Sequence, residues 1–164
     1  MNFKVKVLAV MLVCFQTFAS AQDNFSITPT VGVASPLLDG GVGFHIGVNP
    51  YYSVSSYFAF EGQISYAYVN ITSGFLSGET GNTNTGNFLV GGRLFFRSKE
   101  KKVRPYINLL MGAMINREVS REQVFGPDLS FGGSVGAFVE IDRFVVGASL
   151  DSPQNVTLKV GYLF

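Results

Sequence analysis

His45 is the only histidine of the sequence, so catalysis by an imidazole base would have to depend on it. A hydrolytic triad also needs a serine and a carboxylate held beside the imidazole. His45 stands in the run "VGFHIGVN", where alternation turns it to the same side as Gly47. No serine, histidine and acid arrangement can be assembled from the sequence, and we therefore expect that the protein is not an enzyme.

Two other kinds of chemistry are not indicated by the sequence. No spacing typical of metal ligands is present. The pairs Gly91-Gly92 and Gly132-Gly133 are not phosphate loops, because no helix is predicted after either of them. We therefore expect neither a metal nor a cofactor.

A set of polar side chains alternates with apolar residues and would share one face of a sheet. The set consists of His45, Glu61, Gln63, Arg93, Asn108, Glu140, Asp151 and Lys159. Glu61 and Arg93 would lie on neighbouring strands at similar heights, which permits an ion pair, and interior charges must be paired to be tolerated. We expect a polar network inside the protein. It would act as a structural plug, which is favoured, or line a gated narrow pore.

The stretch "RSKEKKVR" concentrates positive charge around Glu100. Its cations are Arg97, Lys99, Lys101, Lys102 and Arg104. Near an anionic membrane surface, each cation would contribute about 1 kcal/mol through phospholipid headgroups. A solvated turn that fixes the height of the protein in a membrane is favoured over specific contact with headgroups.

The N-terminal segment has the layout of a secretory signal peptide. Lys4 and Lys6 precede an apolar run over 7–19, and small residues follow up to Ala21. The run is too short and too polar to span a bilayer comfortably, which disfavours the alternative of an uncleaved anchor. We predict cleavage after residue 21, which leaves one domain over 22–164.

Removal of residues 1–21 changes the composition of the mature chain. It takes away the only cysteine, Cys14, and leaves ten basic against eleven acidic residues. A disulfide is then impossible. The nearly equal numbers of basic and acidic residues also give no excess of positive charge of the kind that nucleic-acid binding needs.

The remaining chain consists of short alternating segments separated by turn residues. Eight segments cover 24–35, 42–49, 57–68, 87–96, 105–116, 130–141, 144–151 and 155–164. Pro29 cannot donate to a ladder, so the first segment either contains a bulge there or begins as a regular strand near Thr30. Alternation of this kind is the signature of a transmembrane β-barrel.

A soluble β-sandwich or lipocalin-like barrel also alternates, so the pattern alone does not choose between water and lipid. Three features favour lipid. One face is apolar in every segment and dense in Phe and Tyr, the other is mostly small and polar, and the strand number is even. We predict an all-β fold, an eight-stranded antiparallel up-and-down transmembrane β-barrel.

Two stretches resemble a known family. "KVGYLF" resembles the C-terminal insertion signal of Gram-negative outer-membrane β-barrels, and its matching residues are Lys159, Gly161, Tyr162 and Phe164. "RPYINLLMGA" is similar to the fifth strand of small barrels of the OmpX and OmpA type. The end of the signal peptide, "ASAQ", is similar to those of secreted Bacteroidetes proteins. The resemblance covers 22–164 and implies Sec export and location in the outer membrane.

The resemblance also implies a topology with both chain ends in the periplasm. Residues 36–41, 69–86, 117–128 and 152–155 then become outer loops. Residues 50–56, 98–104 and 142–143 become periplasmic turns. The loop over 69–86 is rich in Gly, Thr, Asn and Ser, and a mobile solvated loop is favoured over a specific binding loop.

Partners and function follow from the same resemblance. It implies outer-membrane lipids as partners, with the barrel-assembly machinery and periplasmic chaperones during biogenesis and an unidentified extracellular ligand. Small outer-membrane deacylases and palmitoyltransferases resemble the chain in size, but Gly47 stands where the deacylases have a serine. We expect a structural or surface-interaction role, in envelope integrity, adhesion or host contact. The alternative is a narrow porin-like pore or a component of a transport assembly.

Overall fold

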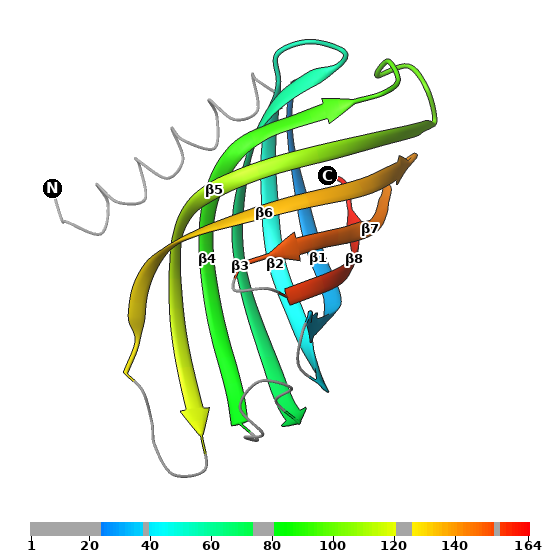
Figure 1. Cartoon of the computed structure of the whole chain (residues 1–164). Coiled ribbons are helices and arrows are strands. Elements are labelled where there is room, and N and C mark those ends of the chain that lie inside the picture. Colours follow the sequence, from blue (N-terminus) through cyan, green and yellow to red (C-terminus); the bar gives the residue numbers. More distant parts are fainter. Residues whose placement is uncertain (1–23, 38–39, 74–80, 121–125, 153–154) are drawn as a thin grey trace, which may run out of the picture.

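The structure is a computed structural model, and it describes residues 24–37, 40–73, 81–120, 126–152 and 155–164. Most of these residues lie in strands (Figure 1). No helix in this part of the chain is long and apolar enough to cross a membrane. The signal peptide expected over 1–21 lies outside the described residues.

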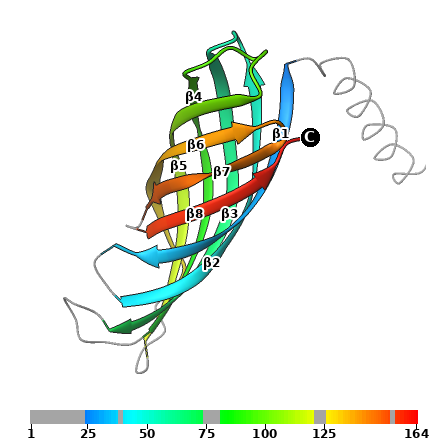
Figure 2. The same ribbon diagram turned by 90° about the vertical axis from the view of Figure 1, so that its right-hand side faces the viewer.

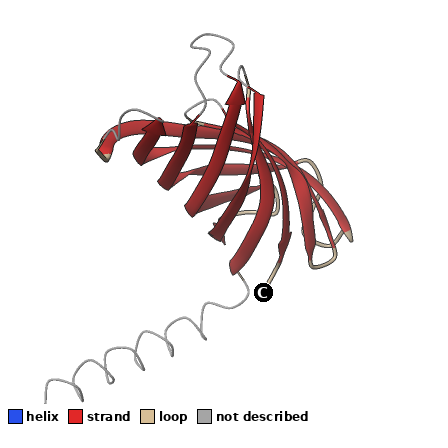
Figure 3. Ribbon diagram, turned by 90° about the horizontal axis from the view of Figure 1, so that it is seen from below, coloured by secondary structure: helices blue, strands red, loops and turns tan. Residues whose placement is uncertain are grey.

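The strands form one closed antiparallel barrel. In chain order they are β1 (Phe25–Pro36), β2 (Gly40–Ser53), β3 (Phe58–Ser73), β4 (Gly81–Phe95), β5 (Val103–Ser120), β6 (Asp128–Ile141), β7 (Phe144–Asp151) and β8 (Asn155–Tyr162). Each strand pairs with the next, and β8 pairs with β1 to close the ring. Seen from below, the strands curve around a common interior (Figure 3). The predicted eight-stranded up-and-down barrel is confirmed.

Side chains alternate between the two faces of the barrel wall. In β2, Phe44 and Ile46 are exposed while His45 and Asn49 are buried. The exposed face carries large apolar residues on every strand, and the buried face carries nearly all of the polar ones. An outward apolar band with a polar interior is the arrangement that a hydrocarbon surrounding requires.

Glycines allow the strands to coil tightly. A Cβ added to Gly43 would collide with the carbonyl oxygen of Tyr68 on β3, and one added to Gly91 would collide with that of Leu109 on β5. Such close approach of neighbouring backbones is one of the uses of glycine inside a strand. These two residues therefore help a narrow barrel to close.

Several strands are longer than the sequence predicted. The expected turn over 50–56 is shorter, because β2 continues to Ser53. The expected loops over 69–86 and 117–128 shrink in the same way, since β3 reaches Ser73, β4 starts at Gly81 and β5 reaches Ser120. The predicted turn at 142–143 is confirmed, and Asp142 adopts φ 53 there, a conformation that Asp tolerates better than most residues.

The wall is uneven at the end opposite the chain termini. β5 has 18 residues whereas β7 and β8 have 8 each. β6 pairs with β5 from Asp128 but with β7 only from Ser134. The wall formed by β3 to β6 therefore projects beyond the β7–β8 hairpin, as Figures 1 and 2 show. Its free edge is the stretch of β6 before Gly133.

Candidate functional site: the barrel lumen

Three buried ion pairs stand in the lumen. Arg93 Nε lies 2.9 Å from Glu61 Oε2, Arg104 Nη1 lies 3.0 Å from Glu140 Oε1, and Lys159 Nζ lies 3.0 Å from Asp151 Oδ2. Each cation thus has its own carboxylate within the described lumen. Matched charges lower the cost of burial, because an unpaired buried charge is strongly destabilising.

An aromatic layer surrounds Arg93 near the end of the barrel where the termini lie. The Arg93 guanidinium is 4.1 Å from the ring centroids of both Tyr51 and Tyr106. The rings of Tyr106 and Phe138 stack with centroids 5.2 Å apart, and Phe95 lies 5.3 Å from Tyr106. Cation–π contacts of this kind strengthen when they are desolvated.

We name Tyr51, Phe95, Tyr106 and Phe138 the aromatic plug. Its members come from β2, β4, β5 and β6, and β2 and β6 lie opposite each other in a ring of eight strands. The aromatic plug therefore crosses the lumen from one wall to the other. An eight-stranded barrel has an interior just wide enough for side chains to fill.

Glu61 is the centre of a hydrogen-bond network beside the aromatic plug. Asn49 Nδ2 donates to Glu61 Oε1 at 2.8 Å, and Asn108 Nδ2 donates to Glu61 Oε2 at 3.2 Å. Asn49 Nδ2 also donates to Gln63 Oε1 at 3.4 Å, and Gln63 Nε2 donates to Ser65 Oγ at 3.0 Å. With Arg93, four side chains of the predicted network meet here.

Asp151 organises a second network. The hydroxyl of Ser134 donates to its Oδ1, and the hydroxyl of Ser149 donates to its Oδ2 at 3.0 Å. Lys159 completes the set through its ion pair. His45 is also buried, 2% exposed, and neither of its nitrogens has a hydrogen-bond partner among the described residues.

The structure places all eight predicted lumen residues in the interior, but not in one network. Glu61, Gln63, Arg93 and Asn108 share the first network, and Asp151 and Lys159 the second. Glu140 pairs with Arg104, whose guanidinium lies 3.8 Å from the ring of Phe95.

Arg104 corrects our expectation for the basic turn. It lies inside β5 and is buried, because the strand already begins at Val103 and the alternation of side chains along the strand turns Arg104 toward the lumen. The other four cations of that stretch, Arg97, Lys99, Lys101 and Lys102, lie between β4 and β5 and are exposed.

Sequence reasoning missed Asn49 and three members of the aromatic plug: Tyr51, Phe95 and Phe138. Their signal was present in the alternation. Phe95 stands between two outward residues, and Phe138 stands between Ala137 and Val139. Tyr51 was placed in the expected turn over 50–56, and Phe95 and Phe138 were assigned to neither face, although alternation along the strands turns all three toward the lumen.

The C-terminal residues close the barrel. Backbone hydrogen bonds join Phe164 N to Ile27 O at 3.0 Å and Ile27 N to Phe164 O at 3.3 Å. Tyr162 and Phe164 face outward with ring centroids 4.9 Å apart, whereas Lys159 faces the lumen.

Pro29 lies in the seam between β1 and β8, and the strand shows no bulge there. β1 begins at Phe25, and the pairs Ile27–Phe164 and Thr30–Gly161 have the same register. Since Ile27 bonds toward β8, Pro29 also faces β8 and supplies no donor there. Of the two alternatives for the first segment, neither a bulge nor a start near Thr30 is observed.

Comparisons with known proteins identify the fold. No protein-family model matches the chain, and no curated protein matches its sequence. Ail, the attachment invasion locus protein of Yersinia pestis, matches over 86% of this chain and 99% of its own, with 19% identity and a TM-score of 0.54. Neisserial surface protein A matches over 85% and 94%, with 12% identity and a TM-score of 0.54.

A third similar structure is the outer-membrane enzyme PagL. It matches over 85% of this chain and 98% of its own, with 17% identity and a TM-score of 0.54. Our expectation that the protein is not an enzyme is therefore wrong as a conclusion, since an enzyme shares this fold. Enzyme status is not established by the fold in either direction.

These likenesses agree with the resemblance to barrels of the OmpX and OmpA type. The chain has the fold of the small eight-stranded outer-membrane β-barrel proteins.

Proposed function

We propose that the protein is an integral outer-membrane barrel with a sealed lumen, which acts through the wall that it projects from the membrane. The observation that carries this proposal is the closure of the lumen. The aromatic plug reaches from β2 to β6, and the three ion pairs leave no described lumen cation without a carboxylate. This supports a structural or surface-interaction role over a porin-like pore.

The free edge of β6 is the contact surface we propose. Gly133 accepts the last hydrogen bond on the β7 side, from Ser152 N at 2.8 Å. Alternate residues of a strand direct their N–H and C=O groups to the same side. Phe131 and Leu129, two and four residues before Gly133, therefore direct theirs to the side of β7, which does not reach this far. Their side chains are 76% and 72% exposed. An extended segment of a partner protein could add a strand there.

The name of Ail describes attachment and invasion, which supports a contact role for a barrel of this fold. Ail has also been solved with the heparin analogue sucrose octasulfate. The expected outer connections of this chain carry Asp39, Glu79, Glu118, Glu122 and Asp128 against Arg117 and Arg121. That acidic excess favours a protein partner over a sulfated polysaccharide.

A proline substitution tests the edge. Phe131→Pro removes one edge donor and leaves the pairing with β5 intact, because Ser130 and Gly132 make the bonds on that side. Phe131→Ala is the matched control, since it removes the ring and keeps the donor. With a photo-crosslinker in place of Leu129 in intact cells, we expect a protein adduct for Phe131→Ala and none for Phe131→Pro. Equal adducts in both variants would contradict the edge.

The chain ends and the assembly route belong to the same proposal. We propose export through the Sec pathway with removal of 1–21, followed by delivery by periplasmic chaperones to the barrel-assembly machinery. The outward pair of Tyr162 and Phe164 would serve as the insertion signal. Mass determination of the protein extracted from outer membranes tests the cleavage site, and an N-terminus other than residue 22 would contradict it.

A further inference from the structure

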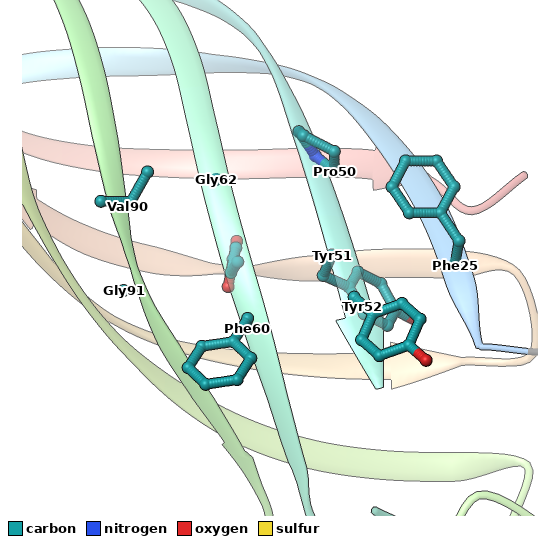
Figure 4. Close-up of a pocket in the computed structure, with 9 residues that line it drawn as sticks. Phe25, Pro50, Tyr51, Tyr52, Phe60, Gly62, Val90 and Gly91 are labelled. Atoms are coloured by element: carbon teal, nitrogen blue, oxygen red, sulfur yellow. The ribbon is translucent and has the colours of Figure 1, made fainter. Parts of the chain in front are cut away.

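A hollow interrupts the outward apolar face between β1 and β4. It has a volume of about 480 Å³ and is lined by Phe25, Pro50, Tyr52, Phe60, Gly62 and Val90 among others (Figure 4). Gly62 faces outward, because its neighbours Glu61 and Gln63 face the lumen. A Cβ added to Gly62 would meet nothing closer than Pro50 Cγ at 3.5 Å. The hollow therefore exists where the wall lacks a side chain.

The surroundings of the hollow determine what can fill it. Phe60 and Val90 are 60% and 67% exposed, and they belong to the apolar band that the barrel presents to hydrocarbon. An unfilled hollow would forfeit dispersion contacts on its whole lining. The linear apolar molecules available at this depth are the acyl chains of lipids.

The basic turn lies at the same end of the barrel. Arg97, Lys101 and Lys102 are exposed there, and Glu100 is the one acid of the turn. Gly62 pairs with Val90, and β4 runs five residues from Val90 to its end at Phe95, after which the basic turn follows.

Strand geometry converts this separation into a depth. Five residues span about 17 Å along a strand, or roughly 13 Å of depth at a strand tilt of about 40°. One leaflet of hydrocarbon is about 15 Å deep, half of the core of a bilayer. A lipid with its phosphate at the basic turn thus reaches the hollow with one acyl chain.

We propose that the hollow and the basic turn together bind one anionic phospholipid. An acyl chain occupies the hollow at Gly62, and the headgroup phosphate contacts Arg97, Lys101 and Lys102. The assignment of this lipid to the periplasmic leaflet rests on the orientation in the proposed function. The binding site itself does not, because hollow and turn are fixed relative to each other by β4.

Native mass spectrometry of the folded barrel in detergent tests the site. Phosphatidylglycerol and phosphatidylethanolamine are the two probes, each titrated separately. We expect a single phosphatidylglycerol to bind at least about tenfold more tightly than phosphatidylethanolamine, which corresponds to about 1.4 kcal/mol. Equal affinity for the two lipids would overturn the role of the basic turn.

Two glycine variants test the hollow. Gly62→Leu fills the hollow and should weaken binding of phosphatidylglycerol about tenfold. Gly86→Leu is the matched control, because Gly86 is also on the outward face, has nothing within 4 Å of its added Cβ, and lies farther along β4 from the turn. Unchanged binding in Gly62→Leu, or equal loss in Gly86→Leu, would overturn the site.

Further variants keep the test decisive. Val90→Phe fills the hollow from β4 and replaces Gly62→Leu if that variant does not fold. Lys101→Gln with Lys102→Gln should bring the affinities for the two lipids together. All of these measurements use purified protein in detergent, so their failure is distinguishable from a failure of the β6 edge, which is tested in cells.

Discussion

Arg93 donates from Nε to Glu61 Oε2 at 2.9 Å across the β3–β4 pair, and both side chains are 1% exposed. The remaining contacts of Glu61, from Asn49 and Asn108, come from β2 and β5. One carboxylate therefore joins four consecutive strands. Since both side chains are buried from solvent, removal of one partner would leave an uncompensated buried charge, which is strongly destabilising.

Arg93→Leu is expected to lower the free energy of unfolding by about 3–5 kcal/mol, because it leaves the Glu61 carboxylate buried without a cation. The sequence has no tryptophan, so unfolding in urea is best followed in lipid vesicles by the gel mobility of the unheated protein. Ser56→Ala in the exposed turn between β2 and β3 is the control and should change the value by less than about 0.5 kcal/mol.

The double variant Arg93→Leu with Glu61→Leu separates pairing from packing. Replacing both partners by apolar residues removes the buried charge as well as the ion pair, so most of the lost stability should return. If the double variant is as unstable as the sum of the two single variants, the two residues do not act as a pair.

The aromatic plug predicts the conductance of the barrel. In planar bilayers the parent protein should show no stable channels. Tyr106→Ala with Phe138→Ala removes two stacked rings of the aromatic plug, on the neighbouring strands β5 and β6, and should produce resolvable current steps. Phe96→Ala with Phe144→Ala removes two outward rings and should leave the membrane sealed. Stable channels in the parent would contradict the sealed lumen.

The barrel itself could be predicted because alternation reports directly on the two faces of a strand. Val156, Leu158 and Val160 alternate with Thr157 and Lys159, and the structure pairs this strand with β1 as a closed barrel requires. The polar interior was predictable for the same reason. Residues such as Glu61 and Arg93 stand between apolar residues, at the alternate positions that face the lumen.

The misplaced residues lie where the expected strands were too short. Arg104 was placed in a turn by its charge, although a closed barrel can bury an arginine that has Glu140 beside it. Strand ends were misplaced because a strand that leaves hydrocarbon no longer needs apolar outward residues. Asn82 and Asn84 therefore resemble a loop, yet they stand in β4 opposite Asn70 and Tyr68.

The seam between β1 and β8 predicts the effect of a one-residue truncation. Deletion of Phe164 removes both backbone hydrogen bonds with Ile27, beside the position where Pro29 already supplies no donor. Two such bonds contribute about 2 kcal/mol, and if most of that is already present when the barrel closes, folding into vesicles slows by roughly tenfold or more. Insertion of the truncated protein at the parent rate would contradict this prediction.

Phe164→Ala is the control for the truncation. It removes the ring but keeps the backbone pair with Ile27, so it isolates the contact between Tyr162 and Phe164. We expect a smaller delay than for the deletion. An equal delay would show that the ring, and not the closure of the seam, determines the folding rate.

Cysteine labelling tests the orientation of the barrel in the membrane. If residues 1–21 are removed, the mature chain has no cysteine, so a single introduced thiol is unambiguous. Pro127→Cys lies at the expected outer end and Lys101→Cys in the expected periplasmic turn, and both positions are exposed. With a membrane-impermeant maleimide on intact cells, we expect labelling at 127 alone, and labelling at both positions once the outer membrane is permeabilised. Labelling at 101 alone in intact cells would invert the topology and would place the projecting wall in the periplasm.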